Sequence, residues 1–202
     1  MKRLRFAIFA FGLAAISAPA FADVAGGPGG YDGVTFVNAV RDSDGNKATE
    51  LLQSRGRGIL DAKNDQGNTG LIVAISRSDE QWTAWLIGKG ADPNVAGKGG
   101  ETPLIAAARV GFVEAADWLL GSGAKVDQTN RMGETALIVA VQLRQPRIVR
   151  LLLQAGANPD KTDTAAGYSA RDYAKRDTRS HEILTIIESA KPTKSVPAAA
   201  KP

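Results

Sequence analysis

The chain has 202 residues, of which 44% are hydrophobic, so it is long enough and apolar enough to form a buried core. It contains no cysteine and one histidine, which excludes disulfides and leaves almost no material for a zinc site or a base-assisted nucleophile. Residues 23–190 hold 19 of the 25 basic side chains and all 21 acidic ones, so the formal net charge of +4 comes from the two ends. Because this body lacks the excess positive charge of a nucleic-acid-binding domain, we expect no nucleic-acid partner.

The first 22 residues have the three parts of a secretory signal peptide. Three basic residues lie among the first five, residues 6–16 are apolar, and APAFA (18–22) ends in a small-x-small cleavage site. The apolar run is shorter than the roughly 20 residues that a membrane-spanning helix needs. We therefore expect cleavage of 1–22 near Ala22, no stable membrane insertion afterwards, and a protein of the bacterial periplasm or one secreted further. The glycine-rich residues 23–33 are expected to form a flexible leader.

A polar segment, DSDGNKATE (42–50), has part of the pattern of an EF-hand calcium loop. Asp42, Asp44 and Asn46 occupy its first, third and fifth positions. The sixth position is Lys47 instead of the glycine that the sharp turn requires, and no glutamate stands at the twelfth. We expect a turn between two helices here, and no bound metal.

The central part of the chain is a tandem repeat. The segments GNTGLIVAI, GETPLIAAA and GETALIVAV begin at Gly67, Gly100 and Gly133, and GADPN, GAKVD and GANPD begin at Gly90, Gly123 and Gly156. A weaker copy, GYSARDYA, occupies 167–174 with a shift of one residue, and a degenerate copy, GVTFVNAV, occupies 33–40. A strict period of this length indicates a solenoid or a similar array.

Each full repeat contains the signals for two short helices. In one copy Thr102 is a good N-cap, Pro103 suits the first helical position, and Gly111 ends the first helix at a tight turn. A second helix is predicted over 112–122, with Gly123 supplying a left-handed stop. A helix of about eight residues is not stable alone in water, so each must pack against its neighbours in the array.

These motifs resemble the ankyrin repeat, a unit of about 33 residues that contains the pattern T-P-L-H-x-A. The resemblance implies an all-α solenoid of helix–turn–helix units joined by hairpin loops. Its expected parts are an ankyrin-repeat domain over 34–190, with a degenerate N-terminal capping repeat (34–64), full repeats (65–97, 98–130 and 131–164) and a C-terminal capping repeat (165–190), then a disordered tail (191–202). The histidine of the family is replaced here by Ile72, Ile105 and Ile138, so we expect apolar contacts between repeats in its place.

The resemblance also implies a protein partner, bound on the concave face formed by the hairpin tips and the exposed side of the first helices. The matching positions mix charges, amides and a thioether: Asp65, Gln66, Asn68, Lys98, Glu101, Arg109, Arg131, Met132, Glu134 and Gln142. We expect no catalytic residue, no cofactor and no metal ligand, because His181, the one candidate base, has no partner in the sequence that would make a site. The predicted function is a non-catalytic binding scaffold, present as a monomer.

Other interpretations remain open at this stage. The array could be an accessory protein that stabilises or inhibits a periplasmic enzyme, a hydrolase with scattered carboxylates, or a spacer between envelope layers. Trp85 and Trp118 lie one repeat period apart, and with Trp82 they are expected to pack in the core. Three arginines are expected on a solvated outer face of their repeat: Arg144, Arg147 and Arg150.

Overall fold

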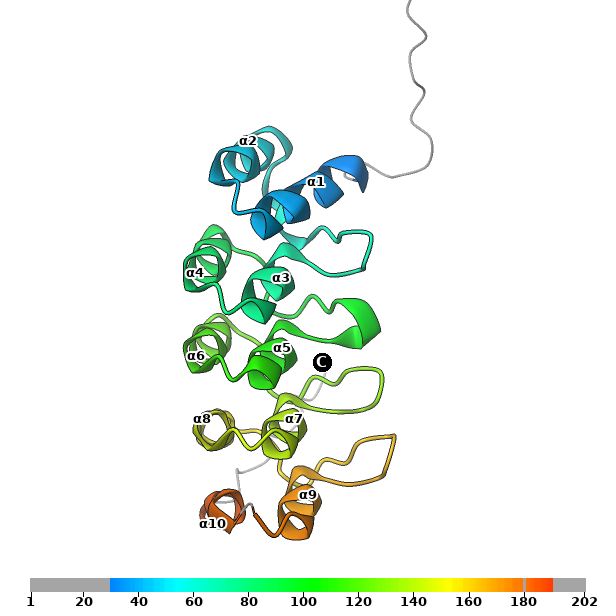
Figure 1. The fold of residues 1–202 in the computed structure, drawn as a ribbon, viewed down its shortest axis with the longest axis vertical. Coiled ribbons are helices and arrows are strands. Elements are labelled where there is room, and N and C mark those ends of the chain that lie inside the picture. Colours follow the sequence, from blue (N-terminus) through cyan, green and yellow to red (C-terminus); the bar gives the residue numbers. More distant parts are fainter. Residues whose placement is uncertain (1–29, 180, 191–202) are drawn as a thin grey trace, which may run out of the picture.

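The computed structural model describes residues 30–179 and 181–190, and these fold into two parallel stacks of short helices (Figure 1). Apart from two isolated β-bridges in loops, the secondary structure of the described residues is helical. The helices are α1 (Gly30–Arg41), α2 (Gly45–Arg55), η1 (Arg57–Asp61), α3 (Gly70–Ser76), α4 (Glu80–Lys89), η2 (Lys98–Gly100), α5 (Pro103–Val110), α6 (Val113–Gly121), α7 (Ala136–Gln142), α8 (Pro146–Gln154), α9 (Ala170–Arg176) and α10 (His181–Ser189). In the described part none is long and apolar enough to span a bilayer.

The two stacks alternate along the chain. The inner helices α1, α3, α5, α7 and α9 pack on one another, and each is followed by an outer helix: α2, α4, α6, α8 and α10 (Figure 1). Helices α5 and α6 begin and end within about one residue of the predicted positions. The signal peptide expected at 1–22, the leader up to residue 29 and the tail at 191–202 lie outside the described residues.

The start of α1 corrects one expectation. Residues 30–33 were expected to belong to a flexible leader, but α1 already begins at Gly30. Gly33 lies within this helix and is buried, and a Cβ added to it would stand 2.6 Å from the side chain of Ala62. This glycine therefore lets the first inner helix approach the following loop closely.

The inner helices begin at hydroxyl caps that recur with the repeat. The hydroxyls of Thr69, Thr102 and Thr135 accept hydrogen bonds from the amides three residues on, at 3.3, 3.1 and 3.2 Å. Ser169 takes the same place before α9, where Asp172 completes a capping box. All four hydroxyl residues are buried, so each cap satisfies a helix end that water does not reach.

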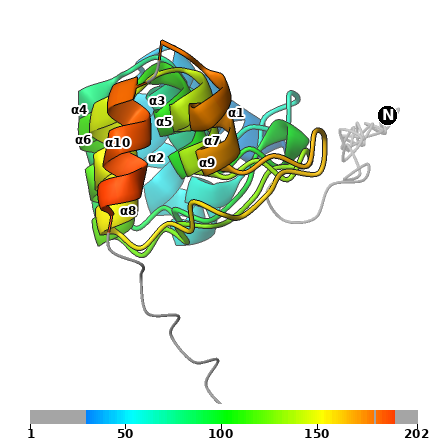
Figure 2. The same cartoon turned by 90° about the horizontal axis from the view of Figure 1, so that it is seen from below.

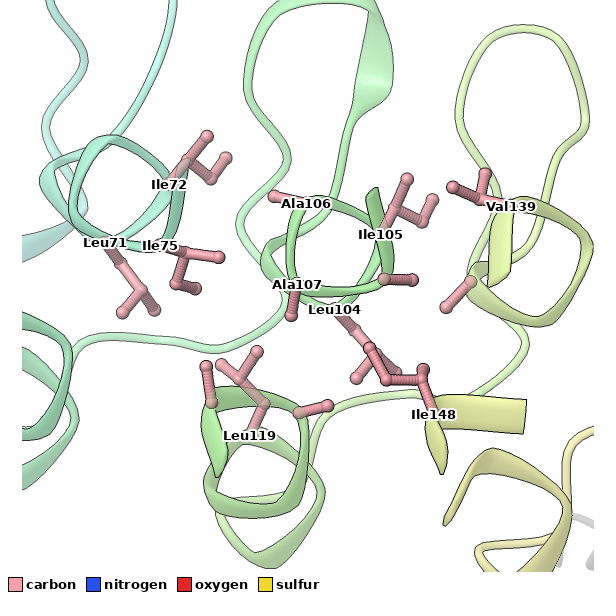
Figure 3. Close-up of a cluster of buried hydrophobic side chains, with 14 of the residues drawn as sticks. Leu71, Ile72, Ile75, Leu104, Ile105, Ala106, Ala107, Leu119, Val139 and Ile148 are labelled. Carbon is pink, nitrogen blue, oxygen red and sulfur yellow. The ribbon is translucent and has the colours of Figure 1, made fainter. Parts of the chain in front are cut away.

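Leucine and isoleucine columns form the core between the two stacks. The inner-helix residues Leu71, Leu104 and Leu137 and the outer-helix residues Leu86, Leu119 and Leu152 are each at most 2% exposed. Ile72, Ile105 and Ile138 are also buried, and Figure 3 shows the first two pointing toward the next repeat. Apolar contacts therefore join neighbouring repeats where the family has its histidine, as predicted.

A ladder of hydrogen bonds also connects successive repeats, at the ends of the outer helices. Carboxylate or amide oxygens at equivalent repeat positions each accept from a backbone amide of the next repeat. The pairs are Asp61 with the amide of Asp92 (2.9 Å), Asn94 with that of Lys125 (2.8 Å), and Asp127 with that of Asn158 (3.0 Å). These bonds fix the position of each loop base relative to its neighbour.

The turn between inner and outer helix requires a left-handed residue in several repeats. Gly111 supplies it in one repeat, with φ of 79°. Ser43, Ser78 and Arg144 occupy the same turn in three others, with φ between 52° and 59°. Three of these turns therefore carry backbone strain that glycine would avoid.

Two predictions about side chains on or beside the outer helices are confirmed in part. The tryptophans Trp82, Trp85 and Trp118 are half-buried on α4 and α6, and Trp82 and Trp85 pack against the buried core without being part of it. All three arginines are exposed as expected, and two of them also form ion pairs with the last repeat: Arg144 with Asp177 (2.6 Å) and Arg150 with Glu182 (2.7 Å). Only Arg147 of this set is exposed without an ion pair in the described part of the chain.

Candidate protein-binding face

The hairpin loops all project from the helix stack on the same side, beside the inner helices and away from the outer ones (Figure 2). The tips of these loops and the exposed side of the inner helices therefore border one continuous surface. We call this surface the inner face; it comprises the loop tips 64–68, 97–101, 130–134 and 163–168 and the exposed side of α3, α5, α7 and α9. All ten residues of the sequence prediction lie on it.

Most loop tips are closed by an Asn or Asp side chain at the same repeat position. Asn64 accepts from the amides of residues 66 and 68, and Asn130 accepts from those of residues 132 and 134, at 2.9–3.1 Å. Asp163 accepts from the amides of residues 166 and 167, at 2.7 and 2.9 Å. Each tip is thereby held in one backbone shape by a local side chain.

The second tip is closed by a side chain of the preceding loop. Gly97 stands where the other loops have Asn or Asp, and a Cβ there would lie 2.6 Å from Asn68 Oδ1 and 2.8 Å from Ile72 Cδ1. The Asn68 oxygen accepts from the amide of Lys98 at 3.0 Å. Asn68, expected to contact a partner, is thus a structural residue that joins two loops.

Backbone hydrogen bonds continue this connection along the other tips. The amide of Arg131 donates to the carbonyl of Gly99, and the amide of Thr164 donates to that of Met132, both at 2.9 Å. Gly133 makes the second contact possible, because its φ is 76° and a Cβ on it would lie 2.6 Å from the backbone nitrogen of Thr164. The loop tips are therefore fixed relative to one another before any partner arrives.

The predicted side chains differ in exposure and in whether they already have a partner within the chain. Seven are exposed, with Met132 51% exposed: Asp65, Gln66, Lys98, Arg109, Arg131, Met132 and Gln142. The other three, Asn68, Glu101 and Glu134, are half-buried. Glu101 pairs with Arg109 at 2.8 Å, and Glu134 accepts from the side-chain amide of Asn130 at 2.7 Å.

The sequence model for "Ankyrin repeats (3 copies)" matches residues 36–130 and 71–163, which together span more than half of the chain. The chain belongs to the ankyrin-repeat family. Ankyrin repeats are generally protein–protein interaction modules and typically non-catalytic scaffolds. A comparison with curated proteins finds no match to this chain.

The last ankyrin repeat adds an aromatic end to the inner face that the sequence analysis missed. The guanidinium carbon of Arg176 lies 4.5 Å from the ring centroid of Tyr168, and the rings of Tyr168 and Tyr173 meet edge to face at 5.6 Å. Tyr168 and Arg176 follow Glu134 and Gln142 by one residue more than the ankyrin period. Extending the predicted positions through this shift would have found both residues.

A buried carboxylate supports this aromatic end. The hydroxyl of Tyr173 donates to Asp163 Oδ2 at 2.6 Å, and Asp163 is 4% exposed. Burial opposes ionisation of Asp163, but the hydrogen bonds from Tyr173 and from three backbone amides outweigh it, and the pKa of the carboxyl is lowered. The same hydrogen bond raises the pKa of Tyr173. Both groups therefore hold a fixed charge state near neutral pH, which suits a structural role.

The described residues do not bring together the groups of a metal site. Within 30–179 and 181–190, no three His, Cys, Asp or Glu side chains gather closely enough to hold an ion. In the segment that resembles a calcium loop, Asp42 pairs with Arg41 at 2.9 Å and Asp44 caps α2. These carboxylates serve the local turn.

Two surface hollows lie on the outer helices of the ankyrin array. One separates α4 from α6 and is lined by small residues together with Ile87, Asp117 and Trp118. The other lies between α2 and α4 and is lined by Trp82 and Trp85 of α4 together with Ser43, Gly45, Thr49 and Gln81. The half-buried tryptophans border these hollows, which explains their exposure.

Proposed function

We propose that this ankyrin-repeat chain is a non-catalytic scaffold of the bacterial periplasm or envelope that binds a protein partner on its inner face. The observation that carries this proposal is the arrangement of the loop tips. Hydrogen bonds between successive loops fix their backbones, while most side chains at the tips project into solvent without a structural task.

A surface held in this way suits binding. Ordering a loop on association costs free energy, and a loop that is already ordered avoids that cost. The exposed side chains include Met132 and several arginines, and the half-buried Tyr168 lies at one end of the face. These residue types are frequent at interface centres.

The periplasmic part of the proposal rests on the signal-peptide pattern of residues 1–22 alone, since that pattern is typical of exported proteins. We propose cleavage after Ala22 and a monomeric mature chain. Intact-mass measurement of the native protein should then give a chain that begins at Asp23, and light scattering after size exclusion should give the mass of one such chain. Retention of Met1 would contradict export.

Capture from periplasmic extract tests the binding surface. The inner-face variant Arg109→Ala/Arg131→Ala/Met132→Ala should lose a partner that the wild-type protein retains. The matched control Glu80→Ala/Glu114→Ala/Asp117→Ala removes three exposed side chains from α4 and α6 and should retain it. Both variants should unfold close to the wild-type temperature, because exposed side chains contribute little to stability. Loss of the partner only in the control would place binding on the outer helices and overturn the proposal.

A further inference from the structure

Two helix glycines keep the hollow between α4 and α6 open. Gly88 lies inside α4 and Gly121 ends α6, and neither has the left-handed backbone for which glycine is usually needed. A Cβ added to either of them would meet no atom within 4 Å. The next repeat has an exposed side chain, Gln154, at the equivalent position. Because glycine weakens a helix, the fold alone gives no reason for these two residues.

The lining of this hollow suits an extended apolar segment. The hollow has a volume of about 520 Å³, and apart from Asp117 and Ser122 its lining is apolar or glycine. Ile87 and Trp118 are its large apolar residues, and both are half-buried, so part of each side chain is available for a contact. Proline-rich segments bind surfaces of this kind, because their polyproline II backbone is already formed and loses little entropy on docking.

The chain itself contains a segment of this composition. Residues 191–202, KPTKSVPAAAKP, follow α10 directly and include three prolines, three lysines and no acidic residue. Such a segment has too few apolar side chains to form a core of its own, so only a surface of the repeats can order it. Because the segment is attached to the array, its effective concentration at a reachable site is in the millimolar range, and a weak contact is enough to hold it.

The hollow lies within reach of this segment. The outer helices stack in the order α10, α8, α6 and α4 (Figure 1). Each of them begins at the turn that follows an inner helix, so α10 ends on the same side of the stack as α4 and α6, where Gly88 and Gly121 lie. Stacked helices are about 8–10 Å apart, which places the hollow about 20–25 Å from α10. A polyproline II segment rises about 3.1 Å per residue and brings residues 196–199 to that distance.

The charge of the outer helices agrees with a basic occupant. Asp117 is the one charged residue that lines the hollow, and it is exposed and makes no ion pair with another described residue. Over α4, α6, α8 and α10 together, five carboxylates are exposed against three lysine or arginine side chains: Glu80, Glu114, Asp117, Glu182 and Glu188 against Lys89, Arg147 and Arg150. A segment with three lysines and no acid is therefore attracted to this side of the array.

We propose that residues 196–199 dock in the hollow between α4 and α6, with Pro197 against Trp118 and a lysine of the same segment beside Asp117. The docked segment crosses α8 and α6, so it joins the last repeat to the middle of the array and covers the aromatic ring that the repeats leave half-buried. This inference concerns the outer helices, goes beyond the proposed function, and does not depend on a partner of the inner face.

A spin label on the full chain, purified as the cell processes it, tests this inference. The chain has no cysteine, so Ala200→Cys provides a single attachment point for a nitroxide just beyond the docked residues. The nitroxide broadens the nuclear magnetic resonance signals of amides near it in the isotope-labelled protein. The amide signals of residues 87, 88, 118 and 121 should lose most of their intensity relative to the same sample after reduction of the nitroxide. Those of residues 43, 45 and 49, beside the hollow between α2 and α4, should keep most of theirs.

Two glycine-to-glutamine variants of the labelled chain provide the control. Gly88→Gln fills the hollow between α4 and α6 with the side chain that Gln154 has in the third full repeat, and it should restore the signals of residues 118 and 121. Gly45→Gln makes the same change at a helix glycine of the other hollow, where a Cβ also meets nothing within 4 Å, and it should leave the broadening as it is. Both variants should fold, because glutamine favours a helix more than glycine does. Restoration by both variants or by neither would overturn the inference.

The remaining outcomes distinguish this contact from its alternatives. Equal broadening along all the outer helices would show that the segment samples the surface without a site, and broadening at the loop tips would place it on the inner face; either result would overturn the inference. Spin-labelled chains without isotope are also mixed with isotope-labelled chains without nitroxide, and the signals should then stay intact. Broadening in that mixture would show docking on a second copy of the chain in place of the contact within one chain.

Discussion

The buried side and the inner face of each repeat follow the same period but differ in how strictly it fixes the residue type. Leucine recurs at every buried position of one column, whereas the loop tips carry opposite charges at equivalent positions: Leu71, Leu104 and Leu137 against Asp65, Lys98 and Arg131. In the core, packing against the neighbouring repeat selects the side chain. At the tips, hydrogen bonds fix the backbone and leave the side chain free. The tips can therefore acquire a binding specificity without loss of stability.

Truncation of a side chain to alanine should give the largest difference in stability between the buried side and the inner face. Leu137→Ala removes a fully buried side chain between α7 and its neighbours and should lower the free energy of unfolding by about 2–5 kcal/mol. Arg131→Ala, at the tip of the same repeat, should change it by no more than about 0.5 kcal/mol. Urea denaturation of both variants measures the contrast. Equal losses would show that the tip is part of the folded core.

Two glycines in successive loops allow the cost of a left-handed backbone to be measured separately from the cost of disrupting a contact between loops. Gly99 and Gly133 have φ of 68° and 76°, but a Cβ on Gly99 meets nothing within 4 Å, whereas one on Gly133 lies 2.6 Å from Thr164 N. Gly99→Ala should cost about 1–2 kcal/mol for the left-handed backbone alone. Gly133→Ala should cost clearly more, because the loop of residue 164 must move. Thermal unfolding measures both costs. Equal unfolding temperatures of the two variants would contradict the close contact between the loops.

The stability that the aromatic end of the inner face contributes should depend on pH. Because the pKa of Asp163 is lowered in the folded state, its ionised form stabilises the protein above its unfolded pKa of about 3.9, and this contribution is lost as pH falls through the folded value. Tyr173→Phe removes one hydrogen bond to that carboxylate and should cost about 1.5–3 kcal/mol at pH 7. The difference between wild type and variant should narrow below about pH 4. A difference that stays constant down to pH 2 would exclude Asp163 as its source.

Removal of a buried helix cap should have the smallest effect on stability in this series. Thr102→Ala removes the hydroxyl that accepts from the amide of Ile105 and should cost about 1 kcal/mol. Thr102→Ser keeps the hydroxyl, as Ser169 does before α9, and should recover most of the loss. Chemical denaturation of the two variants side by side measures this recovery. If serine is as destabilising as alanine, the methyl packing of Thr102 matters more than its cap.

The helices were predicted well because the sequence signals for each helix lie within it or within a few residues of its ends. The cap at Thr102, the stop at Gly111 and the apolar run between them placed α5, and the period carried it to other repeats. Strain was less visible, because Ser78 and Arg144 align with Gly111 in the period but are not residue types that favour a left-handed backbone. These turns follow from the geometry that stacking imposes on each repeat.

Long-range pairing and side-chain direction were the parts that the sequence could not supply. Trp85 and Trp118 precede the core residues Leu86 and Leu119 by one position, and one residue rotates a side chain by about 100° around the helix. The tryptophans therefore lie at the edge of the buried stripe. Asp177 pairs with Arg144 of the preceding repeat, a contact that only the stacked fold reveals.

For the candidate site, the period predicted which positions face outward but not which side chains are already engaged. Asn68 and Glu134 were expected to contact a partner, yet their oxygens accept hydrogen bonds within the loops. Tyr168 and Arg176 were missed because the last repeat is shifted by one residue. Register shifts and local hydrogen bonds therefore limit what a periodic pattern says about a binding surface.

Site-specific photocrosslinking in the cells that make the protein tests the central claim most directly. A photoreactive phenylalanine analogue is placed either at Met132, on the inner face, or at Asp117, on the outer helix α6; both side chains are exposed. Irradiation should give a covalent adduct with one protein from position 132 and none with that protein from position 117. The adduct should disappear when Lys98→Glu and Arg131→Glu are added to the first variant. An adduct formed from position 117 and absent from position 132 would contradict binding on the inner face.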